Sequence, residues 1–148
     1  YSNGIVKNSY STADVTASGS QAGGLIGITN SGSLTENVYA SGTVQALTSN
    51  AGGVTGYGYN ETVVRNVIAL NPSVIAPTMA NRVMGRVLAG HTATLENNYA
   101  YEDMVVEREG VSEDSPTSIR GLSLSESEIE DPLSYINRLG WDFNDIWL

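Results

Sequence analysis

The pattern of apolar and polar positions along this chain repeats every 29 residues. Three columns of matching residues show the period: Asn8, Asn37, Asn66 and, after 31 residues, Asn97; Gly27, Gly56 and Gly85; and Tyr10, Tyr39 and Tyr99, with Ile68 between the last two. An apolar unit this short cannot bury its own face, so it must stack on neighbouring copies. The period therefore predicts a solenoid.

Each copy of the repeat predicts three short strands. Its first half alternates apolar and polar residues around one bend, which is typical of two short strands, and its glycine-rich second half predicts a third. The first half spans residues 4–15, 33–44 and 62–74 in successive copies, and the second spans 23–27, 52–56 and, with fewer glycines, 82–85. These strands predict an all-β fold, a parallel β-helix of about three to four coils, right-handed because parallel crossovers strongly prefer that hand.

Insertions and the loss of the pattern set the expected boundaries. The repeats span residues 1–106, as copies of about 1–30, 31–60 and 61–91 and a partial copy of 92–106, and residues 107–148 follow as an acidic loop and a C-terminal capping segment. The third copy has one extra residue near Pro72 and one fewer before Gly85, so the register is kept. Proline cannot donate to a ladder, so we expect Pro72 and Pro77 at corners or bulges.

The residues after the repeats predict short helices. Ser123 and Glu126 have the spacing of a capping box. Asp131 followed by Pro132 is typical of a helix start, and Gly140 of a helix end.

Large apolar residues gather in this C-terminal segment. The expected cap consists of Leu133, Ile136 and Leu139 on one helix face, and of Trp141, Phe143 and Trp147 after the helix, where residues 141–143 alternate as in a strand. A repeat array needs a cap with a polar outer face. We therefore expect these side chains to be buried against the open end of the last coil.

Charge is distributed unevenly along the chain. Acids and bases cancel in residues 1–100, whereas residues 101–148 carry the whole net charge of −9. Without a basic stripe the chain is a poor nucleic-acid binder, and without a run of 18 apolar residues we expect no membrane span. In the repeats, Lys7, Glu36, Arg65 and Glu96 each precede a ladder asparagine and alternate in sign, which predicts an exposed charge ladder.

Residues suited to catalysis are sparse. His91 is the only histidine and the chain has no cysteine, so a zinc peptidase motif with two histidines cannot be assembled, and we do not expect Ser-His-Asp or Cys-His catalysis. The acids of residues 1–100 do not pair within a coil as a glycosidase requires, and a lyase would have to use Arg82 and Arg86 with Lys7 and Arg65. Acid pairs such as Glu113–Asp114 lack the spacing of a calcium loop. We expect no catalytic residue, no cofactor and no metal site.

The asparagine and tyrosine columns have structural interpretations. Identical amides stacked coil on coil can hydrogen-bond to each other and to bent backbone. The tyrosine column of Tyr10, Tyr39 and Tyr99 is either a stack in or beside the core, which we favour, or an exposed aromatic strip suited to sugar or peptide binding.

The repeat resembles the GLUG motif family. The resemblance lies in the strand-like segments 24–27 and 53–56, in an asparagine followed two residues later by tyrosine at Asn8 and Asn37, and in the closing segment 121–143. Such repeats occur in large exported bacterial proteins, including adhesins, S-layer-linked proteins and IgA1-cleaving zinc metallopeptidases. The resemblance implies a bacterial cell-surface location, with export and anchoring signals outside this sequence.

Three functional hypotheses follow. The first is a non-enzymatic repeat module that serves as stalk, spacer or adhesive surface, with adjacent domains covering its N-terminal coil and a host protein or glycan as possible ligand. The second is an accessory module that orients substrate for a surface zinc metallopeptidase whose catalytic domain lies elsewhere. The third is a carbohydrate-active β-helix.

Overall fold

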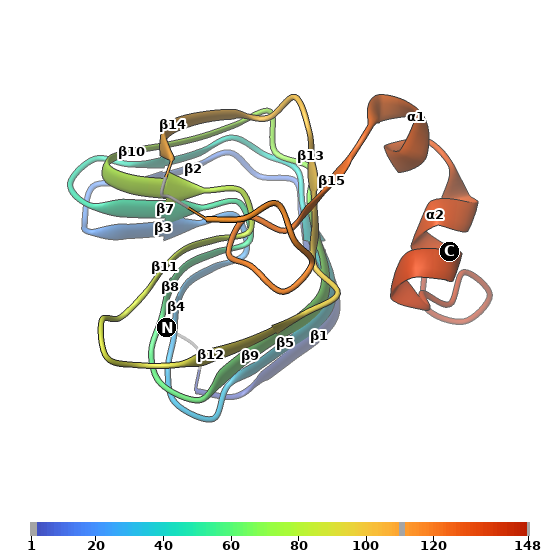
Figure 1. Cartoon of the computed structure of the whole chain (residues 1–148), viewed down its shortest axis with the longest axis horizontal. Helices are drawn as coiled ribbons and strands as arrows, with labels where there is room; N and C mark the ends of the chain where they lie inside the picture. Colours follow the sequence, from blue (N-terminus) through green and yellow to red (C-terminus); the bar gives the residue numbers. More distant parts are fainter. Residues whose placement is uncertain (1–2, 110–111, 148) are drawn as a thin grey trace.

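The computed structural model describes residues 3–109 and 112–147. Residues 1 and 2 of the first expected repeat, 110 and 111 of the expected acidic loop and 148 of the expected cap lie outside the described residues. The described chain is an all-β parallel solenoid of about four coils with two short C-terminal helices, which confirms the predicted fold class (Figure 1). The strands are β1 (Ile5–Ser11), β2 (Val15–Ala17), β3 (Gln21–Gly23), β4 (Ile26–Thr29), β5 (Leu34–Ala40), β6 (Val44–Ala46), β7 (Asn50–Gly52), β8 (Thr55–Gly58), β9 (Thr62–Ala69), β10 (Ser73–Asn81), β11 (Met84–Val87), β12 (Ala93–Glu96), β13 (Tyr99–Tyr101), β14 (Val105–Glu109) and β15 (Leu122–Leu124), and the helices are α1 (Glu126–Ile129) and α2 (Pro132–Leu139).

Strands of successive coils lie side by side in three parallel sheets. The first, here called the ladder sheet, has the order β1-β5-β9-β13-β15, with β12 also paired to β9. The second contains β2, β3, β6, β7, β10 and β14, and the third has the order β11-β8-β4. Pairing follows the sequence period, because Ile5 lies opposite Leu34 and Tyr99 lies opposite Ile68. The period of the repeat thus sets the register of the sheets.

The first two coils have four strands each instead of the expected three, because the glycine-rich segment forms a corner. The chain turns at Gly24 between β3 and β4, and at Gly53 between β7 and β8. A Cβ at Gly24 would lie 2.3 Å from the carbonyl oxygen of Gly53. Adjacent coils therefore approach too closely at this corner for any side chain.

In the third coil the second and third strands join into the long strand β10. Pro72 directly precedes β10, and Pro77 lies inside it where its pairing with β14 shifts register. Val74 pairs with Val44 across 30 residues, whereas Asn81 pairs with Gly52 across 29, so the extra residue is absorbed within the strand. The predicted corner and bulge positions of the two prolines are confirmed.

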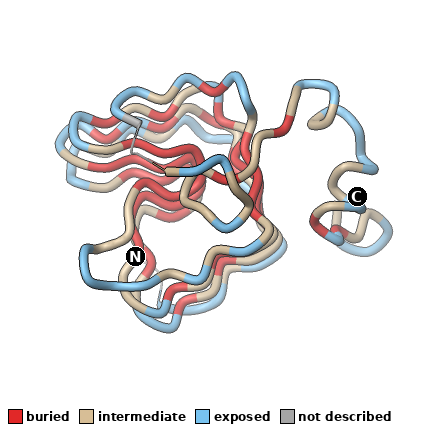
Figure 2. Tube along the Cα trace, in the orientation of Figure 1, coloured by how far each residue is buried: buried red, intermediate tan, exposed pale blue. Residues whose placement is uncertain are grey.

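Small apolar side chains, mainly valine and alanine, fill the interior. Ala40, Ala69 and Ala100 are fully buried at one position of three successive coils, and buried positions recur in the same way in all the sheets (Figure 2). The neighbouring position, which holds the tyrosine column, points outward because side chains alternate along a strand. Alternation thus leaves an apolar stripe on the outer face of the ladder sheet.

The solenoid continues beyond the expected end at residue 106. Strand β14 spans residues 105–109 and pairs with β10, and β15 pairs with β13. Between them the chain crosses the end of the solenoid, where the carbonyl oxygen of Ile119 accepts the backbone N–H groups of Val83 and Met84 at 3.1 and 3.0 Å. The expected acidic loop therefore contains the end of strand β14, and the chain around Ile119 covers the C-terminal end of the solenoid.

Arg82 closes this C-terminal end. It occupies the corner position that is Gly24 and Gly53 in the earlier coils, where no side chain fits between coils. Its almost fully buried guanidinium donates to Asp114 Oδ1 at 2.5 Å and to the carbonyl of Gly121 at 2.9 Å. Burial raises the pKa of Asp114, but hydrogen bonds from Ser123 and Arg82 outweigh it and leave that pKa lowered. An arginine is accommodated here because no further full coil stacks against it.

The helical tail packs against the side of the solenoid and not over its open end, so the expected position of the cap is wrong. Figure 1 shows α1 and α2 beside the ladder sheet. Leu139 and Trp141 of the tail form a second apolar cluster with Ile68, Tyr99 and Leu124, separate from the interior. The tail therefore covers the outward apolar stripe, while the chain around Ile119 covers the end.

The helix boundaries agree in part with the sequence prediction. Helix α2 begins after Asp131, whose Oδ1 accepts the N–H of Leu133 at 3.0 Å, and it ends at Gly140 with a φ of 66°, as predicted. Residues 141–143 do not form the predicted strand.

The capping box lies two residues later than predicted. Ser125 precedes α1, and its backbone N–H and hydroxyl both donate to Glu128 Oε2 at 2.9 Å. Ser123 belongs to β15 instead, so the predicted pairing with Glu126 does not form.

Candidate functional site

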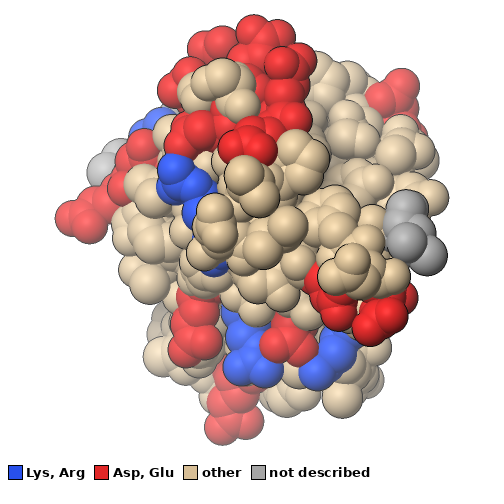
Figure 3. Space-filling view, turned by 90° about the vertical axis from the view of Figure 1, so that its right-hand side faces the viewer, with Lys and Arg blue, Asp and Glu red and all other residues tan. Residues whose placement is uncertain are grey.

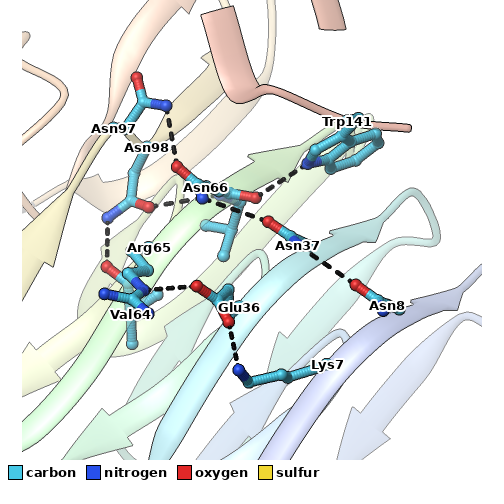
Figure 4. Close-up of polar contacts among 11 residues, drawn as sticks. Lys7, Asn8, Glu36, Asn37, Val64, Arg65, Asn66, Asn97, Asn98 and Trp141 are labelled. Carbon is cyan, nitrogen blue, oxygen red and sulfur yellow. Dashed lines mark hydrogen bonds and ion pairs between the residues drawn. The ribbon is translucent and has the colours of Figure 1, made fainter. Parts of the chain in front are cut away.

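Four asparagines form a continuous hydrogen-bonded ladder on the ladder sheet (Figure 4). The Nδ2 of each of the last three donates to the Oδ1 of the asparagine one coil earlier: Asn37 to Asn8 and Asn66 to Asn37 at 3.2 Å, and Asn97 to Asn66 at 2.9 Å. All four have φ between 49° and 54°. Asparagine visits this left-handed region more easily than other non-glycine residues. The ladder therefore fixes the bend of each coil.

A charge ladder runs beside the asparagines. Glu36 bonds to Lys7 Nζ and to Arg65 Nε, each at 2.6 Å (Figure 4). The hydrogen bond from Lys7, followed by that from Arg65, lowers the pKa of Glu36 against the opposing effect of desolvation. Glu96 lies opposite Arg65 in the register of β12 and β9. Lys7, Glu36 and Arg65, the first three members of the predicted charge ladder, are thus joined by ion pairs.

The tyrosine column lies on the outer face of the ladder sheet, partly beneath the tail. The rings of Tyr10 and Tyr39 are stacked, with centroids 5.1 Å apart and planes 6° apart. Tyr99 is buried beneath the tail, with the Arg138 guanidinium carbon 5.7 Å from its ring centroid. Tyr10 is 60% exposed. The column is therefore a stack beside the solenoid core, covered at one end and open at the other.

Trp141 anchors the tail to this column. It is 4% exposed, and its Nε1 donates to the carbonyl of Asn66 at 3.3 Å. Its ring stacks on Trp147 with centroids 4.4 Å apart and lies tilted against Tyr39 at 6.2 Å. Phe143 and Trp147 are half-buried.

The helix α2 presents a different face from the expected one. Leu139 is buried, but Leu133 and Ile136 are 57% and 42% exposed, so their predicted burial is wrong. Tyr135 takes their place: its ring lies 5.5 Å from that of Trp141, and its hydroxyl donates to the carbonyl of Ile129. The helix is rotated so that this aromatic side chain meets the other rings.

Between the tail and the open end of the tyrosine column lies a groove of about 660 Å³. This size lies within the usual range for small-molecule sites. Its lining combines six aromatic rings with hydroxyl, amide, carboxylate and aliphatic groups. The lining residues are Asn8, Tyr10, Thr12, Tyr39, Ser41, Leu70, Ile129, Glu130, Pro132, Tyr135, Trp141, Phe143, Ile146 and Trp147. We name this site the aromatic groove.

The electrostatics of the aromatic groove favour uncharged ligands. Among its described lining residues, Glu130 is the only acid, and there is no lysine, arginine or histidine. Desolvation raises the pKa values of Tyr39 and Tyr135, so both phenols stay neutral at ordinary pH. Figure 3 shows acidic side chains gathered at the margins of the tail-bearing face, with a largely uncharged centre.

The other candidate residues do not assemble into a catalytic centre. Lys7 and Arg65 bond to Glu36, while Arg82 bonds to Asp114 at the end of the solenoid and Arg86 lies in the third sheet. Within residues 3–109 and 112–147, no three His, Asp or Glu side chains gather as a metal site.

Asp14 and His91 also take part in hydrogen bonds between coils. Asp14 accepts the N–H and the hydroxyl of Thr43 at 2.7 and 2.8 Å, which lowers its pKa. His91 is exposed, and its Nδ1 accepts the N–H of Asn60 at 3.0 Å.

Sequence reasoning did not find the aromatic groove. It identified five of the six rings, but it treated the tyrosines and the C-terminal aromatics as separate structures. Tyr135 and Glu130 received no role, although Tyr135 could have been recognised as lying on the same helix face as Leu139.

Comparisons of the chain with protein-family models, with curated proteins and with solved structures found no match. Neither helix in the described part of the chain is long and apolar enough to cross a membrane.

Proposed function

We propose that this chain is a non-enzymatic repeat module of a large exported bacterial surface protein, in which the solenoid is a stalk and the aromatic groove on its side is an adhesive site for a neutral saccharide. The observation that carries the proposal is the composition of the groove. Six aromatic rings form its walls, polar groups lie among them, and no described cation lines it.

A pyranose ring matches this lining chemically. Its C–H face is apolar and packs on aromatic rings, whose faces carry partial negative charge. Its hydroxyl groups both donate and accept, and so suit the amide of Asn8, the hydroxyls of Thr12 and Ser41 and the carboxylate of Glu130. Phosphate, sulfate and acidic sugars usually require arginine or lysine partners, so they fit this groove poorly.

A non-enzymatic role is supported by the bonding of the ionisable groups. Asp14, Glu36 and Arg82 are each held in structural hydrogen bonds or ion pairs. Among the described lining residues Glu130 is the only carboxylate, whereas glycoside hydrolysis requires a pair. The resemblance of the repeat to the GLUG motif supports placing the module in an exported bacterial protein.

Glycan-array screening of the purified chain, followed by surface plasmon resonance on the bound glycans, tests the proposal. Tyr10→Ala removes an exposed groove wall and should weaken binding about tenfold, the equivalent of roughly 1.4 kcal/mol. Ile5→Ala is the matched control, because Ile5 is also an exposed apolar side chain on β1 but does not line the groove. The control should bind like the parent.

The same glycans and a peptide library are incubated with the chain and analysed by mass spectrometry. Unchanged glycans are expected. Cleaved glycan that disappears on Glu130→Gln would establish a carbohydrate-active enzyme instead. Binding confined to peptides would favour the substrate-orienting module of a peptidase.

A further inference from the structure

The N-terminal face of the solenoid differs from its C-terminal end. Strands β1, β2, β3 and β4 each pair with a strand of the second coil, and their other edges have no strand partner in the described chain. Val15 is half-buried, whereas its counterparts Val44 and Val74 are 1% and 0% exposed. At the other end, Arg82 and the chain around Ile119 cover the last coil. The two ends therefore cannot join copies head to tail without displacing that cover.

At Gly27 the described chain leaves space for a larger residue. It lies in β4 outside the left-handed region, and a Cβ added there would meet only the carbonyl oxygen of Gln21, at an ordinary 3.7 Å. At the matching position of the second coil, a Cβ on Gly56 would lie 2.5 and 2.6 Å from the carbonyl oxygens of Ala22 and Gly27 in the coil before it. Gly85 meets the second coil in the same way. The glycine column thus makes room for a preceding coil, and at Gly27 none of the described residues occupies that room.

At this face the first members of the asparagine, charge and tyrosine columns each have a described partner on one side only. Each later asparagine donates to the one before it, whereas the Nδ2 of Asn8 has no acceptor among the described residues. Lys7 has an acid on one side only, in a row whose sign alternates. The stacked ring of Tyr10 is covered by Tyr39 on one face and is otherwise 60% exposed.

We infer that the N-terminal face is a docking surface for a further parallel coil of the same 29-residue repeat. The partner carries an acid opposite Lys7, an asparagine opposite Asn8, an aromatic ring opposite Tyr10 and a backbone that occupies the space beside Gly27. The inference rests on continuity with the coil-on-coil interface within the chain, and it does not depend on any ligand of the aromatic groove. The additional ring would lengthen that groove along the solenoid axis.

The second coil supplies a ready-made partner for the test. A copy of residues 30–58 fused directly before Tyr1 brings counterparts of Glu36, Asn37, Tyr39 and Gly56 into the required register. The fused chain should melt in one cooperative transition, with Tm raised by at least about 4 °C, and the amides of β1 should become protected from hydrogen exchange. The same copy with lysine at its Glu36 counterpart should raise Tm by less, because that lysine faces Lys7.

Gly27→Ala separates docking from general stability. In the unfused chain it should leave Tm within about 1 °C of the parent. In the fused chain it should remove most of the gain, because the methyl group meets the backbone of the added coil. Gly56→Ala, the matched control, should lower Tm in both chains.

Three results would overturn the inference: a fused chain with the Tm and β1 exchange of the unfused one, an equal effect of Gly27→Ala in both chains, or an unfused chain that dimerises through this face. Light scattering with and without Gly27→Ala detects the last of these. If the fused chain fails to fold, a copy of residues 30–58 added as a separate peptide must protect the β1 amides in the parent and not in Gly27→Ala, or the inference is wrong.

Discussion

Trp141→Ala should release the tail from the solenoid without unfolding the coils. Trp141 is the most deeply buried aromatic of the tail and the one whose indole bonds to the ladder sheet, through the carbonyl of Asn66. Its ring also supports Trp147 and Tyr135, which lie 4.4 and 5.5 Å from it between centroids. The substitution therefore removes the anchor and the packing of its two neighbours together.

The magnitude follows from burial. Truncating a buried tryptophan to alanine costs about 3–5 kcal/mol. The lost hydrogen bond accounts for about 1 kcal/mol of this total. This lowers the ratio of docked to undocked tail by roughly two to three and a half powers of ten. The tail cluster and the interior of the solenoid are separate apolar clusters. The cost therefore falls on docking, and the exposed aromatic stripe should promote association at high concentration.

Hydrogen exchange and limited trypsin digestion measure docking directly. In Trp141→Ala, amides of α2 should exchange faster and cleavage after Arg138 should accelerate, while amides of β5 and β9 stay protected. Leu133→Ala is the matched control on the same helix, and because Leu133 is exposed it should change stability by no more than about 0.5 kcal/mol. A Trp141→Ala variant with a protected tail, or a Leu133→Ala variant with an equally loosened one, would show that the tail is held by other contacts.

Three further variants test the ladders and the end cover. Asn66→Ala should lower the free energy of unfolding, measured in urea, by about 1–3 kcal/mol, since alanine is strained at a φ of 52° and both ladder hydrogen bonds are lost. Asn66→Gly loses the same hydrogen bonds without the strain and should cost less. Equal costs for the two variants would show that backbone strain does not contribute. Asp114→Ala should cost about 1–3 kcal/mol, because it leaves the buried guanidinium of Arg82 without its carboxylate; hydrogen exchange should rise first in β11 and β15. The lowered pKa of Glu36 means that its contribution to stability is present above its ordinary pKa of 4.5 and is lost as pH falls through the lower folded value. Tm should therefore fall on acidification in that range, and fall less in Glu36→Gln; parallel pH profiles would contradict this.

The sequence by itself determined the coil, because the information for it is local and periodic. A 29-residue spacing of Asn8, Asn37 and Asn66 is sufficient to place them in one column, since neighbouring coils pair in register. Pro72 and Pro77 could be placed because proline lacks a donor wherever it stands. Asp131 and Gly140 could be placed because helix caps depend on a few adjacent residues.

Only the tertiary structure decided what the coils and the tail cover. The period identifies a column without saying which side of the strand faces inward, so the same pattern allowed Tyr39 to be core or surface. Small alanines at 40, 69 and 100 fill a narrow interior, and their neighbours in the tyrosine column, Tyr39, Ile68 and Tyr99, lie on the other side of the strand. The tail then packs on those rings because this removes an outer apolar stripe from water, whereas the end of the solenoid is already closed by Arg82.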